Sequence, residues 1–146
     1  MLTSVDRLLF VRRVPIFQEL RDDFIVRLAS VMDEWSFGAN HTIFRQGEEG
    51  RSLFIVVSGR VKVHIEDRQL ATFPQGESFG EMAVFDAQPR SATATTLEQS
   101  DCLELTQEQL HDAIEETPEI ALNIIRVLSR RIRDLNAVIN EFGIEE

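Results

Sequence analysis

The sequence predicts a mainly β domain with flanking helices, and two observations support this prediction. Between residues 35 and 106 the chain consists of short runs rich in β-branched and aromatic residues, separated by turns that contain glycine. Before and after this part, apolar residues recur instead at the spacing of amphipathic helices. About eight short strands joined by close turns favour a barrel, a roll or a sandwich over an α/β sheet.

The length and composition favour one domain. The chain has 146 residues, enough for one hydrophobic core and too few for two of ordinary size. Its 43% of hydrophobic and 27% of charged residues are usual for a globular protein, so we expect an ordered chain. We expect a single domain over residues 1–146, with N-terminal helices at 1–34, a strand-rich part at 35–106 and C-terminal helices at 107–142.

Two short helices are predicted before the strands. The first begins with Ser4, a good N-cap residue, and Pro15 ends it. The second lies within residues 21–35 and places Phe24 and Leu28 on one apolar face.

Most strands are predicted from apolar runs that lie between turn residues. In chain order these runs are EWSF, HTIFRQ, LFIVVS, RVKVHI, LATF, SATATT and DCLELT. Trp35 alternates with Phe37 in the first run, and we expect its side chain in the core. Cys102, in the last run, is expected to be a small buried strand residue.

Two more helices are predicted after the strands. Thr106 is a suitable N-cap for the first, which continues through QEQLHDAIEE. Pro118, as a first-turn residue after Thr117, starts the second helix, which is ~35 Å long. One face of this last helix carries a broad apolar stripe, made of Ile124, Ile125, Leu128, Ile132, Leu135, Val138, Ile139 and Phe142.

Charge and composition exclude several kinds of partner. The formal net charge of −10 repels a phosphate backbone, so this chain alone is a poor candidate for binding nucleic acid. The longest apolar run, residues 53–57, is too short to span a bilayer, and the N-terminus lacks the features of a secretory signal. A single cysteine excludes an internal disulfide. We therefore expect a cytoplasmic protein without a membrane segment.

The sequence contains no catalytic or metal-binding pattern that we can identify. His41, His64 and His111 are too widely separated for an H-x-H metal pair, and surface histidines are the better interpretation. No serine stands in a G-x-S-x-G context, and Glu81 has no partner carboxylate that would indicate hydrolysis. We expect no enzyme activity, no metal and no catalytic cofactor.

The segment FGEMAVFDAQPRSATATT, residues 79–96, is unlike the regular elements beside it. It places Glu81 and Arg90 nine positions apart, on either side of a short apolar turn. One interpretation is an internal ion pair that closes the loop. The other is that both charges bind one ligand.

The residues beside these two charges suit a nucleotide. A phosphodiester needs a planar fork of donors and accessible backbone N–H groups, which Arg90 and the small residues Ser91 and Ala92 provide. A ribose hydroxyl needs an acceptor, which Glu81 beside the flexible Gly80 can supply. From composition alone, both the ion pair and the ligand site stay open.

The segment FGEMAVFDAQPRSA, residues 79–92, resembles the phosphate-binding cassette of the cyclic nucleotide-binding domains of catabolite activator proteins, kinase regulatory subunits and gated channels. Its F-G-E, apolar turn and R-(S/T/A)-A all stand at the family's spacing. FRQGEEGRSLFIVVSGRVKV and VPIFQEL also match, so the resemblance covers roughly residues 14–142. One departure is Arg51, where the family often has an acidic or amide residue. The resemblance implies an eight-stranded antiparallel, jelly-roll-like β-roll with N-terminal helices and a long C-terminal helix.

The resemblance also implies a ligand and the residues that hold it. We expect cAMP, with cGMP as the alternative, because Ser91 does not decide between the two bases. Arg90 and Ser91 would hold the cyclic phosphate, and Glu81 with the Gly80 backbone would hold the ribose 2′-hydroxyl. The other residues implied are Ala83 and Ala92 beside the phosphate, and Val63, Ala71 and Phe73 against the purine.

In the family the last helix closes over the base and in many members forms a dimer interface, so we expect it to move on binding and to form a homodimer. Arg131, or Arg130, either turns toward the ligand or belongs to a solvated helix face. Asn136 either contacts an adenine edge or is an exposed helix residue. Activator-type relatives continue into a helix-turn-helix, so this chain is either a stand-alone module or a fragment.

Two other functions remain alternatives. The first is a protein-interaction module that has lost nucleotide binding, against which the intact Glu81 and Arg90 argue. The second is a sensor of another effector, such as haem, an iron–sulfur cluster or a small organic acid. The single cysteine and the lack of an axial-ligand pattern disfavour haem and the cluster.

Overall fold

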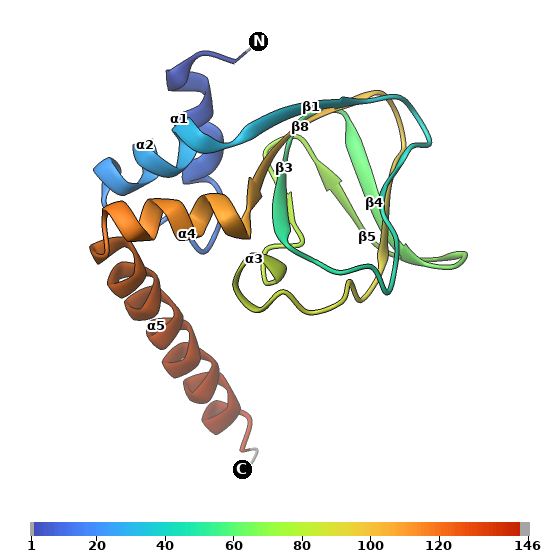
Figure 1. Ribbon diagram of the computed structural model, residues 1–146. Coiled ribbons are helices and arrows are strands. Elements are labelled where there is room, and N and C mark those ends of the chain that lie inside the picture. Colours follow the sequence, from blue (N-terminus) through green and yellow to red (C-terminus); the bar gives the residue numbers. More distant parts are fainter. Residues whose placement is uncertain (1, 144–146) are drawn as a thin grey trace.

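The computed structural model describes residues 2–143 and consists of a roll of strands with helices packed at one side (Figure 1). Helices α1 (Ser4–Arg12) and α2 (Asp22–Val31) precede β1 (Asp33–Phe37), β2 (Thr42–Phe44), β3 (Ser52–Ser58), β4 (Arg60–Ile65), β5 (Arg68–Pro74) and β6 (Ser78–Phe79). Then follow α3 (Ala83–Asp86), β7 (Thr93–Thr96), β8 (Ser100–Thr106), α4 (Gln107–Glu116) and α5 (Glu119–Glu141).

The eight strands form two antiparallel sheets of four strands each. The strand order is β1-β8-β3-β6 in one sheet and β2-β7-β4-β5 in the other. An inner cluster of buried side chains joins the two sheets, with Phe54, Val56 and Cys102 from the first and Val61 and Ala94 from the second. The predicted eight-stranded antiparallel roll with flanking helices is therefore confirmed.

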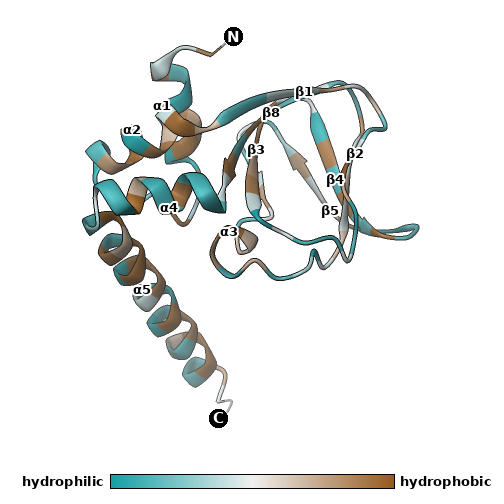
Figure 2. Ribbon diagram, in the orientation of Figure 1, coloured by the Kyte–Doolittle hydropathy of each residue, from teal (hydrophilic) through white to brown (hydrophobic). Residues whose placement is uncertain are grey.

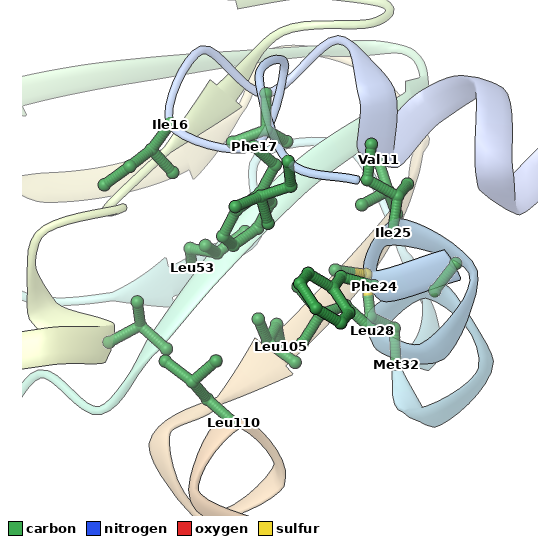
Figure 3. Packing of buried hydrophobic residues seen from close by; sticks show 14 of the residues in the cluster. Val11, Ile16, Phe17, Phe24, Ile25, Leu28, Met32, Leu53, Leu105 and Leu110 are labelled. Carbon is green, nitrogen blue, oxygen red and sulfur yellow. The ribbon is translucent and has the colours of Figure 1, made fainter. Parts of the chain in front are cut away.

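Strand β3 is buried on both faces, which is why its sequence is a continuous apolar run. Phe54 and Val56 point into the roll, whereas Leu53 and Ile55 point toward the helices, because successive strand residues alternate between faces. Figure 3 shows the cluster on the helical side, where Val11, Ile16, Phe17, Phe24, Ile25, Leu28 and Met32 pack with Leu53, Leu105 and Leu110. Each large buried side chain contributes about 1.5–3 kcal/mol, so this cluster fixes the helices to the roll.

Capping residues determine where the helices begin, and the sequence analysis misplaced two of these starts. The N-cap of α1 is Thr3 rather than Ser4, because Thr3 and Asp6 form a reciprocal capping box. Pro118 is the N-cap of α5 rather than a first-turn residue. Thr106 caps α4, as predicted.

The prediction that Trp35 lies in the core is wrong. β1 is an edge strand of its sheet, and Trp35 is 48% exposed, with its indole Nε1–H donating to Glu104 at 2.9 Å. Phe37 stacks beside it and packs partly against the inner cluster. Alternation identifies the face that these two residues share, but an edge strand leaves part of that face uncovered. Cys102 is buried, as predicted.

Helix α5 packs on the rest of the domain only near its start. Ile120, Ile124 and Val127 are buried, whereas Ile132 and Leu135 are 60% and 63% exposed. Figure 1 shows the helix leading away from the roll, and Figure 2 shows apolar residues recurring along its whole length. Neither α5 nor another helix within residues 2–143 is both long enough and apolar enough to cross a bilayer.

Candidate functional site

A cavity of about 430 Å³ lies between the segment 79–92 and strands of the second sheet. This volume is in the range of sites that hold small molecules. The lining residues are Phe44, Val63, Phe73, Phe79, Gly80, Glu81, Met82, Ala83, Asp86, Gln88, Pro89, Arg90, Ser91 and Ala92.

Most of the residues predicted for the site therefore lie together. Gly80, Glu81, Ala83, Arg90, Ser91 and Ala92 line the cavity from the cassette, and Val63 and Phe73 line it from β4 and β5. Ala71 pairs with Val63 across these two strands but is not among the lining residues.

The structure does not bring the predicted α5 residues to the cavity. Asn136 is exposed and Arg131 is half-buried, and neither lines the cavity. The side chain of Arg130 instead forms an ion pair with Glu19 of the N-terminal part. A role for Arg131 or Asn136 in binding requires α5 to move, and it stays a prediction.

Arg90 is buried, with only 8% of its surface exposed, although it carries a charge. Its Nη2 donates to the Ser52 carbonyl oxygen at 2.8 Å and to the Ser52 Oγ at 3.4 Å, and its Nη1 donates to the Gly80 carbonyl oxygen at 3.4 Å. The guanidinium carbon lies 4.0 Å from the centre of the Phe44 ring, a favourable cation–π contact. These contacts hold the guanidinium at the wall of the cavity.

The described part of the chain does not contain the internal ion pair between Glu81 and Arg90 that was one interpretation of the cassette. Within residues 2–143, no ion pair joins Arg90 to Glu81 or to another carboxylate. In the same range, Nε of Arg90 and Oε2 of Glu81 are buried without a hydrogen-bond partner. An unsatisfied buried polar group costs about 1–3 kcal/mol, and more when it is charged. Two such groups at one cavity indicate a site built for a polar ligand.

Two glycines let the backbone approach Arg90 closely. Gly80 has a φ of +72°, and a Cβ there would lie 2.5 Å from Nη1 of Arg90. A Cβ on Gly50 would lie 2.8 Å from the Gln88 carbonyl oxygen and 3.1 Å from Nε of Arg90. Any side chain at either position would therefore displace the guanidinium or the loop that carries it.

The backbone of Arg90 is anchored to the turn before β3. Its N–H donates to the Glu48 carbonyl oxygen at 2.7 Å, and its carbonyl oxygen accepts from the Gly47 N–H at 2.8 Å. Burial lowers the pKa of the Arg90 guanidinium from its ordinary value, and the charges of Glu104 and Glu48 partly oppose this. Because a guanidinium starts from so high a pKa, it remains a cation at neutral pH.

Sequence reasoning missed the residues that hold Arg90 from outside the cassette. Phe44 stands in a predicted strand, Ser52 stands directly before the next one, and Gly50 stands in the GEEG turn between them. The period of two predicts which strand residues share a face, but it does not predict that these strands meet the cassette. The closely spaced glycines of QGEEG were the one available signal for a close backbone approach.

Comparisons with known proteins agree with this geometry. The family model described as "Cyclic nucleotide-binding domain" matches residues 34–117. A CRP-like cAMP-activated global transcriptional regulator of Mycobacterium tuberculosis is 33% identical over 129 residues, which are 85% of this chain and 58% of that protein. A cGMP-dependent protein kinase of Caenorhabditis elegans is 39% identical over 89 residues, which are 57% of this chain and 11% of the kinase.

A solved structure shares both the fold and the sequence. The N-terminal domain of a transcriptional regulator from Streptomyces coelicolor has a TM-score of 0.81 and 32% identity, covering 89% of this chain and 94% of that domain. The chain spans about 58% of the length of the mycobacterial regulator. Since the family model matches more than half of the chain and the cassette lines the cavity, this protein belongs to the family of cyclic nucleotide-binding domains.

Proposed function

We propose that this cavity binds cAMP and that binding shifts the position of α5. One observation carries the proposal: within residues 2–143, the buried Nε of Arg90 and the buried Oε2 of Glu81 lack partners, and both residues line the same cavity. A cyclic nucleotide carries an anionic phosphate and a ribose hydroxyl on one rigid framework. It therefore supplies an acceptor for the cation and a donor for the carboxylate.

The lining residues divide into a polar and an apolar part that suit such a ligand. The phosphate would contact Arg90 and the exposed hydroxyl of Ser91, and the ribose 2′-hydroxyl would donate to Glu81. Val63 and Phe73 provide an apolar wall for the purine. Binding of this kind is regulatory and involves no chemical step.

The choice of cAMP over cGMP rests on the relatives. The mycobacterial protein, named as cAMP-activated, matches 85% of the chain, whereas the kinase named for cGMP matches 57%. Asn136 would add to the preference if α5 covers the base, because an amide offers one donor and one acceptor to adenine.

The proposed movement of α5 is supported by how little holds the helix. Its first half buries Ile120, Ile124 and Val127. It is also tied to the N-terminal part by Asn123, whose Oδ1 accepts from the Arg21 N–H at 3.1 Å, and by the Arg130–Glu19 ion pair. Beyond Leu128 its apolar side chains are largely exposed. A ligand that offers apolar surface to these residues binds the closed position better and shifts the equilibrium toward it.

The test is a titration of the chain with cAMP and cGMP, followed by calorimetry and by thermal melting. Ligand at about 100 times its Kd stabilises the folded state by about 2.7 kcal/mol, so the melting temperature rises. Arg90→Lys should weaken binding by about 2–4 kcal/mol, because lysine lacks the planar fork. Arg68→Lys, at an exposed position, is the matched control and should bind like the parent.

Glu81→Gln should weaken binding less than Arg90→Lys, because an amide still presents an acceptor oxygen. If neither nucleotide at millimolar concentration changes the melting curve, the proposed function is wrong, and the protein-interaction module becomes the better reading. If Arg90→Lys binds like the parent, Arg90 is a structural charge rather than a phosphate ligand.

A further inference from the structure

Glu104 of β8 is linked to Arg90 through Ser52, and it is not among the residues that line the cavity. Its Oε2 accepts from the Ser52 hydroxyl at 2.8 Å, and its Oε1 accepts from the Trp35 indole N–H at 2.9 Å. The same Ser52 accepts from Nη2 of Arg90 through both its carbonyl oxygen and its hydroxyl. A hydrogen-bonded chain thus leads from the guanidinium through one serine to a carboxylate.

A buried cation needs a negative charge nearby, since burial without a counter-charge is costly. Within residues 2–143, no carboxylate forms a direct ion pair with Arg90. Among the charges that raise the pKa of Arg90, and so oppose the effect of burial, that of Glu104 has the largest effect. Arg51, the neighbour of Ser52 in sequence, is exposed and pairs with Glu49 instead.

The bonds to Ser52 also fix the orientation of the guanidinium. They occupy Nη2, whereas Nε is buried and its N–H has no partner among residues 2–143. If the guanidinium rotated about its side-chain axis, Nη2 would lose both contacts with Ser52. Any group that fixes Ser52 therefore also fixes the direction of the Nε–H.

We propose that Glu104 is a positioning residue for Arg90: through Ser52 it fixes the orientation of the guanidinium beside the cavity. The expected effect of Glu104 on cAMP affinity rests on the proposed function. The expected effect of Glu104 on the orientation of Arg90 is independent of it, because that effect concerns the protein without ligand.

The first experiment needs no ligand. NMR spectra identify the Arg90 Nε–H signal by its loss in Arg90→Lys, and its exchange with solvent is measured in the parent and in two variants. Glu104→Gln removes the charge but keeps one acceptor oxygen for Ser52 or Trp35. Ser52→Ala removes the hydroxyl that links Glu104 to Arg90. Both should speed the exchange at least about tenfold, because Arg90 becomes mobile.

The matched control is Asp101→Asn. Asp101 lies on the same strand, and its carboxylate also accepts from two neighbouring side chains, Ser36 at 2.6 Å and Ser58 at 3.2 Å. Its substitution should leave the Arg90 signal unchanged. Unchanged exchange in both Glu104→Gln and Ser52→Ala overturns the proposal, whatever the chain binds.

The second experiment is calorimetry with cAMP. Glu104→Gln should weaken binding about five- to tenfold in the parent background, as expected for groups in one network, and should have no further effect when Arg90 is already Lys. An additive loss in both backgrounds, or tighter binding by Glu104→Gln, contradicts a role through Arg90. If the parent itself does not bind cAMP, the proposed function fails, and the exchange measurement still decides the role of Glu104.

Discussion

Gly80 shows how a residue without a side chain shapes this site. Its φ of +72° and the 2.5 Å that would separate an added Cβ from Nη1 of Arg90 leave room only for glycine. In the family motif this glycine was identified from the letters F-G-E, and the resemblance assigned its backbone to the ribose. The structure adds a second reason for it, the close packing of the guanidinium.

We predict that Gly80→Ala lowers both stability and ligand affinity. The positive φ costs an L-residue about 1–3 kcal/mol, and the methyl group displaces Arg90 from its contacts with Ser52. Urea unfolding and calorimetry with cAMP measure the two effects. Gly38→Ala is the control, because nothing lies within 4 Å of a Cβ there. Equal binding by the parent and Gly80→Ala would show that Arg90 tolerates displacement.

A second residue-scale prediction concerns the base. If α5 closes over the purine, Asn136 contacts adenine, and cAMP binds about tenfold more tightly than cGMP, or about 1.4 kcal/mol. Asn136→Ala should remove most of this preference and leave phosphate-driven binding in place. The ratio of the two dissociation constants is the measurement. An unchanged ratio in the variant would identify Asn136 as a solvated helix residue, as it is in the present position of α5.

Among the elements, α5 leaves the apolar face of its outer half uncovered by the rest of the domain. Ile125, Ile132 and Ile139 recur every seven residues, and Leu128, Leu135 and Phe142 do so three residues later. This is the a/d repeat of a coiled coil, and most of these side chains are exposed. The resemblance to the family implied a dimer through this helix, and the exposure of the stripe supports that prediction.

We predict that the chain dimerises through this repeat and that Leu135→Glu produces a monomer. A charge at a d position must be buried against the partner helix, which costs more than the interface gains. Sedimentation equilibrium measures the change. Ala137→Glu, exposed on the same helix outside the repeat, should leave the dimer intact. A parent that sediments as a monomer with and without cAMP contradicts the prediction.

At the scale of the whole molecule, the buried Cys102 links folding stability to alkaline pH. Burial, with a smaller effect of Asp101, raises the pKa of Cys102 from 9.0 to about 12. Between these values the unfolded chain loses the thiol proton while the folded chain keeps it. The folded state then binds more protons, so the free energy of unfolding falls as pH rises through this window.

We predict that between pH 7.5 and pH 10.5 the parent loses about 2 kcal/mol more stability than Cys102→Ala. Urea unfolding at the two pH values measures the difference. The chain has no tyrosine and one lysine, Lys62, so few other groups titrate in this range. The same pH dependence in both proteins would mean that the thiol titrates normally in the folded state.

Local rules in the sequence determined the elements of this protein. Glycine-bounded apolar runs predicted the strands, Thr106 predicted the start of α4, and the resemblance of residues 79–92 to the family's cassette predicted the site. These features depend on the period of side chains, on capping and on a short motif, all of which act over a few residues. The short strand β6 and the one-turn helix α3 were not predicted, because neither is long enough to show a period.

Only the tertiary structure decided what surrounds Arg90 and what α5 covers. Phe44 and Ser52 contact the guanidinium from two strands, and Glu104 contacts Ser52 from a third. Their meeting depends on the order of strands in the two sheets. The same order makes β1 an edge strand and leaves Trp35 exposed. Sequence periodicity specifies which face of an element is apolar, but the partner of that face is decided by which elements pack together. The domain core covers only the inner half of α5.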